Sequence, residues 1–152
     1  MIEWSIWADI ATVLTSISLI GAIISLARET RTQNLQSFFY LHGYLSQDEF
    51  SKARKAIRTE QFCKLYSSWT EEDKMNANKV CASYDQTGIF LSMGILDKKT
   101  MQEFLSSSWG DSIIDQYESL APFLDDNQTP TQTGREFFRH FAWLYNEAKK
   151  YH

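Results

Sequence analysis

The longest apolar run of the chain, Ile10–Ala27, has no charged residue, but serine, threonine, alanine and glycine fill half of it. Its length lies at the lower limit for an α-helix that crosses about 30 Å of hydrocarbon. Both ends of the run must therefore be considered before a membrane span is assigned.

The residues that flank this run are typical of a membrane-spanning helix. Trp4 and Trp7 precede it, and Arg28 and Arg31 follow it directly, as expected for an aromatic belt and a cytoplasmic basic end. A cleaved signal peptide is disfavoured because no basic residue precedes the run, whereas a buried helix of a soluble bundle is the remaining alternative. We predict a single-pass anchor over residues 1–32, in a bacterial inner membrane, with the N-terminus outside.

The small residues of the run recur at steps of three and four, which places them on one face of a helix. Bulky isoleucine and leucine residues occupy the opposite face. In lipid, helices associate through close approach at small residues and through hydroxyl hydrogen bonds. We therefore expect a homo-oligomer that forms along this small-residue seam, which consists of Ala8, Ala11, Thr15, Ser18, Ala22 and Ser25.

After the anchor, aromatic and leucine positions from Leu35 to Leu45 continue the helical spacing, so the anchor helix is expected to run on. Ser46 and Glu49 have the spacing of a capping box that opens a second helix. Thr70 and Asp73 repeat that spacing and predict a helix that ends at about Met93, before Gly94.

The remaining helices are predicted from apolar spacing and from a third capping pattern. Two helical runs are expected between Asp97 and Leu124, separated near Trp109–Gly110. Thr133 and Glu136 then predict the start of a final helix. No alternating run typical of a β-strand occurs, so we predict an all-α fold in which the transmembrane helix precedes a small cytoplasmic helical bundle over residues 33–152.

Charge and cysteine content narrow the possible functions. All 15 lysine and arginine residues lie at or after Arg28, where acidic residues slightly outnumber them, so nucleic-acid binding is not expected. Cys63 and Cys81 lack metal-ligand spacing and are expected to be free core residues. The chain has no phosphate-binding, nucleophile-elbow or zinc-protease motif, and we predict no catalytic residue, no metal and no cofactor.

Two charged surfaces are candidates for contacts with a partner. Asp111, Asp115 and Glu118 share one helical face, which is expected either to be solvated or to meet the basic helix of a neighbouring subunit. That basic helix is also a candidate for contact with anionic lipid or a protein partner. Its candidate residues are Lys52, Arg54, Lys55 and Arg58.

A polar stripe is predicted on the helix that follows Thr70. Asn78, Asp85 and Ser92 are seven residues apart and share one face. We expect Asn78, Asp85 and Arg135 to form a buried polar cluster, or the stripe to be solvated, while a face that binds a ligand or a metal is the alternative interpretation.

Three stretches, "NKVCASYDQTGIFLSMGILDKK", "FLSSSWGDSIIDQYESLAPFL" and "GREFFRHFAWLYNEAKK", resemble a domain-of-unknown-function family. The resemblance is to bacterial proteins with one N-terminal span and a helical cytoplasmic domain. It implies fold and topology but no activity, and no site residue is transferred from it.

These observations together predict a non-enzymatic, membrane-anchored protein that associates with itself and with a protein partner. We expect it to act as an accessory or effector subunit of a bacterial membrane complex, for example in phage defence or stress signalling. A pore-forming or membrane-perturbing effector and a small-ligand sensor are the alternatives.

Overall fold

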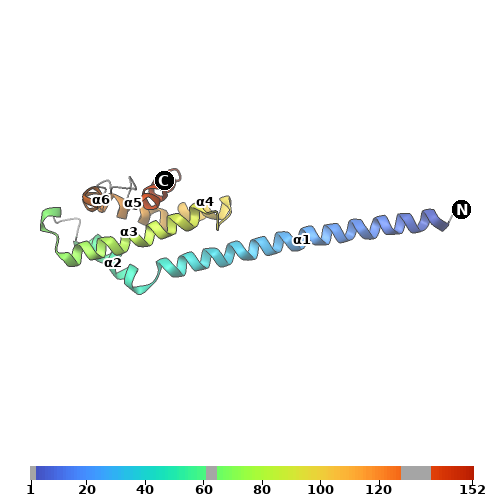
Figure 1. Ribbon diagram of the computed structural model, residues 1–152, viewed down its shortest axis with the longest axis horizontal. Coiled ribbons are helices and arrows are strands. Elements are labelled where there is room, and N and C mark those ends of the chain that lie inside the picture. Colours follow the sequence, from blue (N-terminus) through green and yellow to red (C-terminus); the bar gives the residue numbers. More distant parts are fainter. Residues whose placement is uncertain (1–2, 61–64, 128–137) are drawn as a thin grey trace, which may run out of the picture. The chain divides into compact units, whose positions relative to one another are not determined.

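The computed structural model describes residues 3–60, 65–127 and 138–152, and side chains at residues 18, 21–58, 65–126 and 138–152. These residues form seven α-helices and one short 3-10 helix, and no strand occurs among them (Figure 1). The prediction of an all-α protein is therefore confirmed.

The chain divides into two compact units, Met1–Gln36 and Ser37–His152. The first helix, α1 (Glu3–Leu45), provides the first unit and continues into the second. The continuous helix expected beyond the apolar run is therefore confirmed. The boundary lies close to the one predicted between residues 32 and 33.

In the first unit, every described side chain is exposed except Asn34, which is half-buried. Among the residues that the structure describes, no helix has both the length and the hydropathy of a membrane-spanning helix. Most of Ile10–Ala27, on which the predicted anchor rests, lies outside the described side chains. The transmembrane helix accordingly gains no support from the structure and stays a prediction.

The second unit continues with α2 (Asp48–Glu60), the 3-10 helix η2 (Tyr66–Ser68) and α3 (Glu71–Ser92). We expected Ser46 to cap the second helix, but α2 begins two residues later, at Asp48. The Ser46 Oγ lies 3.5 Å from His42 Nδ1, near the end of α1.

The ends of α3 lie where the sequence predicts them. Thr70 and Asp73 form the expected capping box, in which the Asp73 backbone N–H donates to Thr70 Oγ1 over 3.2 Å. At the other end, Met93 caps the helix and Gly94 has a φ of 74°, a conformation that favours glycine.

Three further short helices follow: α4 (Lys98–Leu105), α5 (Ser108–Ser119) and α6 (Ala121–Asn127). The predicted break near Trp109–Gly110 lies slightly earlier, because the Ser107 hydroxyl accepts a hydrogen bond from the Trp109 N–H and caps α5.

The last helix is α7 (Arg139–Ala148). The predicted capping residues Thr133 and Glu136 lie outside the described residues.

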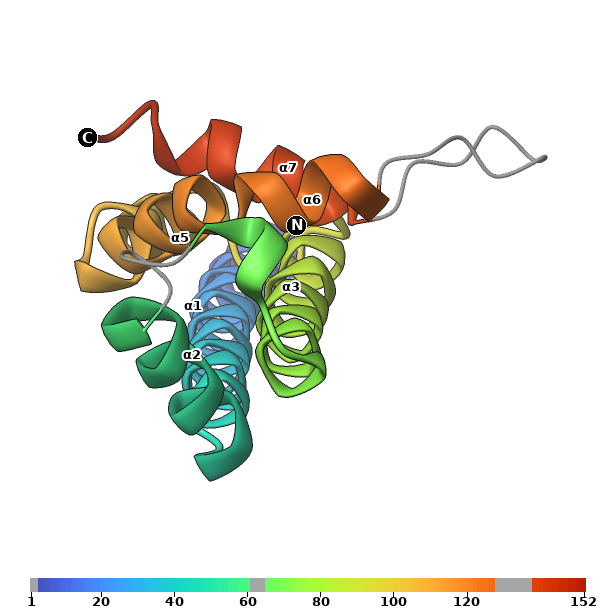
Figure 2. The same cartoon turned by 90° about the vertical axis from the view of Figure 1, so that its left-hand side faces the viewer.

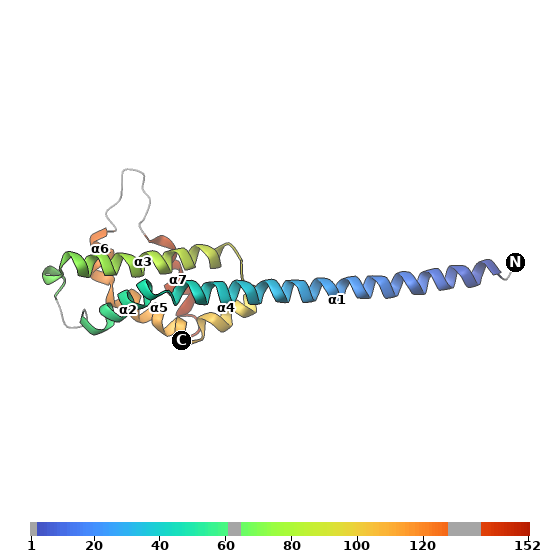
Figure 3. The ribbon, with the colours of Figure 1, turned by 90° about the horizontal axis from the view of Figure 1, so that it is seen from below.

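The bundle is organised around α3, which packs against both α2 and α7. In Figure 2, α6 and α7 lie along one side of the group formed by α2, α3 and α5, and Figure 3 shows α7 against α3 from a second direction. The core takes residues from every helix of the unit. Its largest fully buried apolar side chains are Leu41, Leu45, Ile57, Val80, Tyr84, Phe104, Leu105, Ile113, Leu120, Phe141 and Leu144.

Candidate functional site

The basic residues of α2 do not form one surface. Lys52 and Lys55 are exposed and Arg58 is partly exposed, but Arg54 is only 9% exposed. The prediction that Arg54 contacts lipid or a partner is therefore wrong. Its long side chain turns inward beside Ala53 and Ile57, which are buried in the core.

Inside the bundle, Arg54 joins three helices. Its Nη2 donates a hydrogen bond to the backbone carbonyl of Leu45, the last residue of α1. Carbonyls at the end of a helix have no partner within the helix and form the negative end of its dipole, so a guanidinium is a favourable partner there. Arg54 Cζ also lies 5.8 Å from the ring centroid of Tyr84 and 5.3 Å from that of Trp109, within the range of a cation–π contact.

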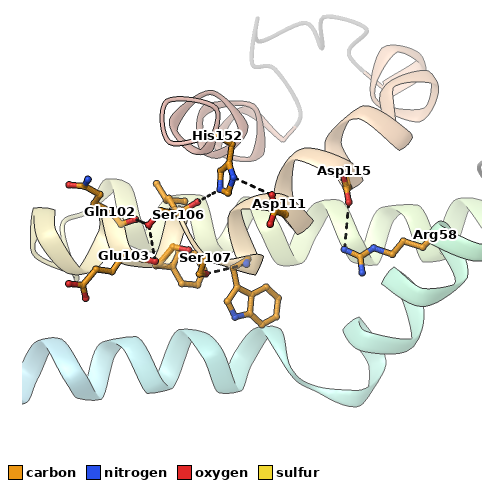
Figure 4. A network of polar contacts seen from close by, with 11 residues as sticks. Arg58, Gln102, Glu103, Ser106, Ser107, Asp111, Asp115 and His152 are labelled. Carbon is orange, nitrogen blue, oxygen red and sulfur yellow. Dashed lines mark hydrogen bonds and ion pairs between the residues drawn. The ribbon is translucent and has the colours of Figure 1, made fainter.

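A chain of polar contacts leads from this arginine toward the surface between α2 and α5. The hydroxyls of Tyr84 and Ser112 lie 3.0 Å apart, and Arg58 Nη2 donates to Ser112 Oγ over 3.1 Å. Arg58 also forms an ion pair with Asp115 at 3.9 Å (Figure 4). Because Arg58 and Asp115 are about half exposed, this outer pair contributes little to stability.

Several buried polar atoms near this chain have no hydrogen-bond partner within the described protein. They are Arg54 Nη1 and both amide atoms of Gln116, Nε2 and Oε1. Gln116 is completely buried and lies one helical turn beyond Ser112, on the same face of α5. Such atoms are rare in folded proteins and call for a physical explanation.

Burial and neighbouring groups act on the charge of Arg54 in opposite directions. Among the ion pairs of the described residues, none gives Arg54 a carboxylate partner. Burial is the largest effect and lowers the pKa of Arg54, the neighbouring Tyr84 raises it, and the positive charge of Arg58 lowers it. Burial also raises the pKa of the Tyr84 hydroxyl, so this group stays protonated at neutral pH.

A second polar network lies at the junction of α4 and α5. His152 Nε2 lies 2.7 Å from the backbone oxygen of Leu105, and Nδ1 lies 3.2 Å from Asp111 Oδ1 (Figure 4). Gly110 makes this approach possible, because a Cβ there would lie 1.8 Å from the Leu105 oxygen. This network fastens residue 152 to the bundle.

A comparison with known protein families shows the family to which the chain belongs. The family model described as a domain of unknown function, DUF4760, matches residues 11–148. The chain belongs to the DUF4760 family. No curated protein and no solved structure matches it. The predicted resemblance is thus confirmed for the family, while the bacterial source and the membrane span of this DUF4760 protein stay predictions.

The acidic face of the DUF4760 bundle is occupied within the same chain. Asp115 pairs with Arg58, Asp111 with His152, and Glu118 with Lys149 at 3.8 Å. The pairs of Arg58 with Asp115 and of Lys149 with Glu118 join side chains that are about half exposed, so they are weak. The predicted pairing with a neighbouring subunit therefore stays a prediction.

The predicted buried cluster of Asn78, Asp85 and Arg135 is also corrected. Asn78 is exposed, and Arg135 lies outside the described residues. Asp85 Oδ1 accepts hydrogen bonds from the backbone N–H groups of His140 and Phe141, over 2.8 and 3.1 Å. Asp85 therefore satisfies the first turn of α7, whose own capping residue, Phe138, has no capping side-chain bond.

Other predicted residues have simpler outcomes. The seam residues Ser18, Ala22 and Ser25 are exposed, whereas Ala8, Ala11 and Thr15 lie outside the described side chains. Cys81 is free and buried, as predicted, and its burial raises the pKa of the thiol, while Cys63 lies outside the described residues. Within the described part of the DUF4760 chain, no three histidine, cysteine or acidic side chains gather as metal ligands would.

Sequence reasoning missed the interior of the polar network. Ser112 and Gln116 lie on the apolar face of α5 together with Ile113 and Leu120. The available signal was the i, i+4 spacing of two polar residues on a face that is otherwise apolar.

Proposed function

We propose that this DUF4760 protein is a membrane-anchored, self-associating helical protein that acts through binding, as a non-enzymatic accessory or effector subunit of a bacterial membrane complex. The first unit would anchor it in the inner membrane, with the bundle on the cytoplasmic side. The bundle would then bind a protein partner or another copy of the chain.

The main support for this proposal is the exposure of large apolar side chains in the first unit. In the first unit, Ile23, Ile24 and Leu26 are 59%, 48% and 66% exposed. Large apolar side chains on adjacent turns of one helix are unfavourable in water and indicate a surface that another apolar phase covers. The charge-free run Ile10–Ala27 contains these residues, and lipid is the cover that suits a helix of this composition.

The orientation rests on the charges that follow the run. Arg28 and Arg31 are both exposed, and no lysine or arginine precedes them in the sequence. Basic residues are retained on the cytoplasmic side of a membrane helix, so the bundle is assigned to the cytoplasm.

Self-association is assigned to the small-residue seam. Its described members, Ser18, Ala22 and Ser25, are exposed on α1, so their face is accessible to a second helix. Each interhelical hydroxyl contact in lipid contributes on the order of 1 kcal/mol. Several such contacts along one seam would favour the pairing of two anchors.

The bundle also carries exposed apolar side chains that suit a protein contact. Phe39, Tyr40 and Met93 are exposed, and the rings of Tyr40 and Phe90 contact edge to face, with centroids 6.0 Å apart. Aromatic and methionine side chains are enriched in protein interfaces. We assign the partner contact to this group.

The mass of the detergent-solubilised full chain tests the proposal. We expect an oligomer for the native sequence and a monomer for a chain that starts after residue 32. The double variant Ser18→Ile/Ala22→Ile should also be monomeric, because large side chains prevent close approach of the helices.

The matched control is Ile24→Phe, which enlarges a residue on the opposite face of α1 and should leave the mass unchanged. An oligomer that survives both the truncation and the double substitution would refute self-association through the anchor.

A further inference from the structure

The spacing of the small-residue seam continues along α1 beyond its last member, Ser25. Alternate steps of four and three residues lead from Ser25 to five further positions, all of them exposed. Steps of this kind keep side chains on one face of a helix, so the seam does not end with the charge-free run. We call these positions the seam extension, which consists of Glu29, Thr32, Gln36, Phe39 and Gly43.

Within the second unit, the bundle packs against the opposite side of α1. Leu41 is completely buried and lies two residues from both Phe39 and Gly43, which is about half a turn around a helix. Phe39 is 68% exposed. Beyond the neighbouring residues and the nearby backbone of its own helix, no atom lies within 4 Å of a Cβ at Gly43. The bundle therefore leaves the seam extension uncovered.

This uncovered face has the composition of a protein interface. No lysine, arginine, aspartate or glutamate occurs between Arg31 and Asp48, and exposed aromatic side chains away from charges are typical of the centre of an interface. The rings of Phe38 and Phe39 meet edge to face, with centroids 6.1 Å apart. Because Phe38 packs against the core, it supports the exposed ring of Phe39 from behind.

The charges at the start of the seam extension are complementary to those of a second copy of the chain. Arg28 and Glu29 are exposed, and the ion pairs of the described residues include neither of them. In a parallel pair of helices, a seam residue packs between the seam residues of the other helix and the residues that flank them. Glu29 of one copy would therefore meet Arg28 of the second copy, and the contact occurs twice by symmetry.

We propose that a second copy of this chain covers the seam extension, so that two α1 helices pair in parallel from the anchor into the bundle. This inference rests on the proposed function, because two anchors inserted with the same orientation are necessarily parallel. Phe39 of each copy packs beside the open space at Gly43. The Gln36 amides, which both donate and accept, hydrogen-bond to each other across the pair.

Photo-crosslinking of the full chain in membranes identifies what covers Phe39. The photoreactive residue p-benzoylphenylalanine replaces Phe39 in one sample and Met75, an exposed residue of α3, in the control. We expect light to give a covalent dimer from position 39 alone, attached within residues 36–43 of the second copy. A product with a different protein, an attachment outside this range, equal products from both positions or no product from position 39 would overturn the proposal.

Like charges placed on the seam extension should separate the two copies. Phe39→Glu brings two carboxylates together, and we expect the dissociation constant of the detergent-solubilised chain to rise at least tenfold. Met75→Glu adds the same charge elsewhere and should leave this constant unchanged. Gly43→Arg is the second variant, because the open space there accommodates a long side chain within one copy. It should weaken association to a similar extent, and an unchanged constant in both seam variants would contradict the proposed contact.

The double variant Ser18→Ile/Ala22→Ile separates this inference from the proposed function. If the double variant is monomeric while Phe39→Glu and Gly43→Arg keep the native mass, the anchors associate without the seam extension, and only the further inference fails. A native chain that is itself monomeric in detergent would refute self-association through the anchor and, with it, the pairing along the bundle.

Discussion

The same kinds of side chain have opposite surroundings in the two units of this protein. Ile57 and Ile113 are completely buried in the second unit, whereas Ile23 and Ile24 are largely exposed in the first. Composition alone does not produce this difference, because all four residues are isoleucines on helices. Their surroundings decide it: in the second unit, neighbouring helices cover the two isoleucines, whereas the first unit consists of a single helix and offers Ile23 and Ile24 no such cover.

The two units therefore differ in how much they contribute to the free energy of folding. The bundle is stabilised by its own core, so a loss of apolar volume there should lower the free energy of unfolding. Under the proposed function, the exposed apolar side chains of the first unit would contribute instead to association with lipid or with a second helix. Paired substitutions in the two regions separate these contributions.

The largest effect is expected for Ile113→Ala. This side chain is fully buried in α5, and its truncation leaves a cavity that close-packed neighbours fill only partly. The free energy of unfolding should fall by about 4 kcal/mol, as measured by denaturant unfolding followed by circular dichroism. A loss below about 1 kcal/mol would show that Ile113 is not in a packed core.

A slightly smaller effect is expected for Gly88→Ala, at the contact of α3 with α7. A Cβ at this position would lie 2.3 Å from the backbone oxygen of His140, so the two helices would have to separate. Overpacking of this kind should destabilise the bundle by about 3 kcal/mol. Gly43→Ala is the control, since beyond the neighbouring residues and the nearby backbone of its own helix no atom lies within 4 Å of its Cβ position, and it should be neutral or slightly stabilising.

Asp85→Ala should destabilise the bundle by about 2 kcal/mol, because two backbone N–H groups at the start of α7 lose their acceptor. Hydrogen exchange of the His140 and Phe141 amides measures the effect locally. Asp85→Asn keeps an acceptor oxygen and should recover part of the loss. Protection of these amides that Asp85→Ala leaves unchanged would contradict the capping role.

The smallest effect is expected for Ile23→Ala in the first unit. Because this side chain is already 59% exposed, the free energy of unfolding of the bundle should change by less than about 0.5 kcal/mol. Ile23→Ala and Ile113→Ala make the same change at an exposed and at a buried position. Equal destabilisation by the two substitutions would remove the difference between the units.

Features that depend on local sequence could be predicted. The capping box of Thr70 and Asp73 and the end of α3 before Gly94 both follow from spacing over a few residues. These signals act within one helical turn, so they do not depend on how the helices pack.

Features that depend on packing between helices could not be predicted. Arg54 and Arg58 are both arginines and lie one turn apart on the same side of α2, yet Arg54 is buried and Arg58 is half exposed. The difference arises from Leu45, Tyr84 and Trp109, which belong to three other helices. Likewise, the role of Asp85 depends on a helix that begins more than fifty residues later.

Membrane fractionation tests the central claim most directly. Lysed cells that express the intact chain are separated by ultracentrifugation, and the pellet is washed with high salt before detergent is added. We predict that the chain stays in the pellet through the salt wash and dissolves only in detergent, because an apolar helix in lipid is not released by screening of charges. A chain found wholly in the supernatant without detergent would contradict the anchor and, with it, the proposed function.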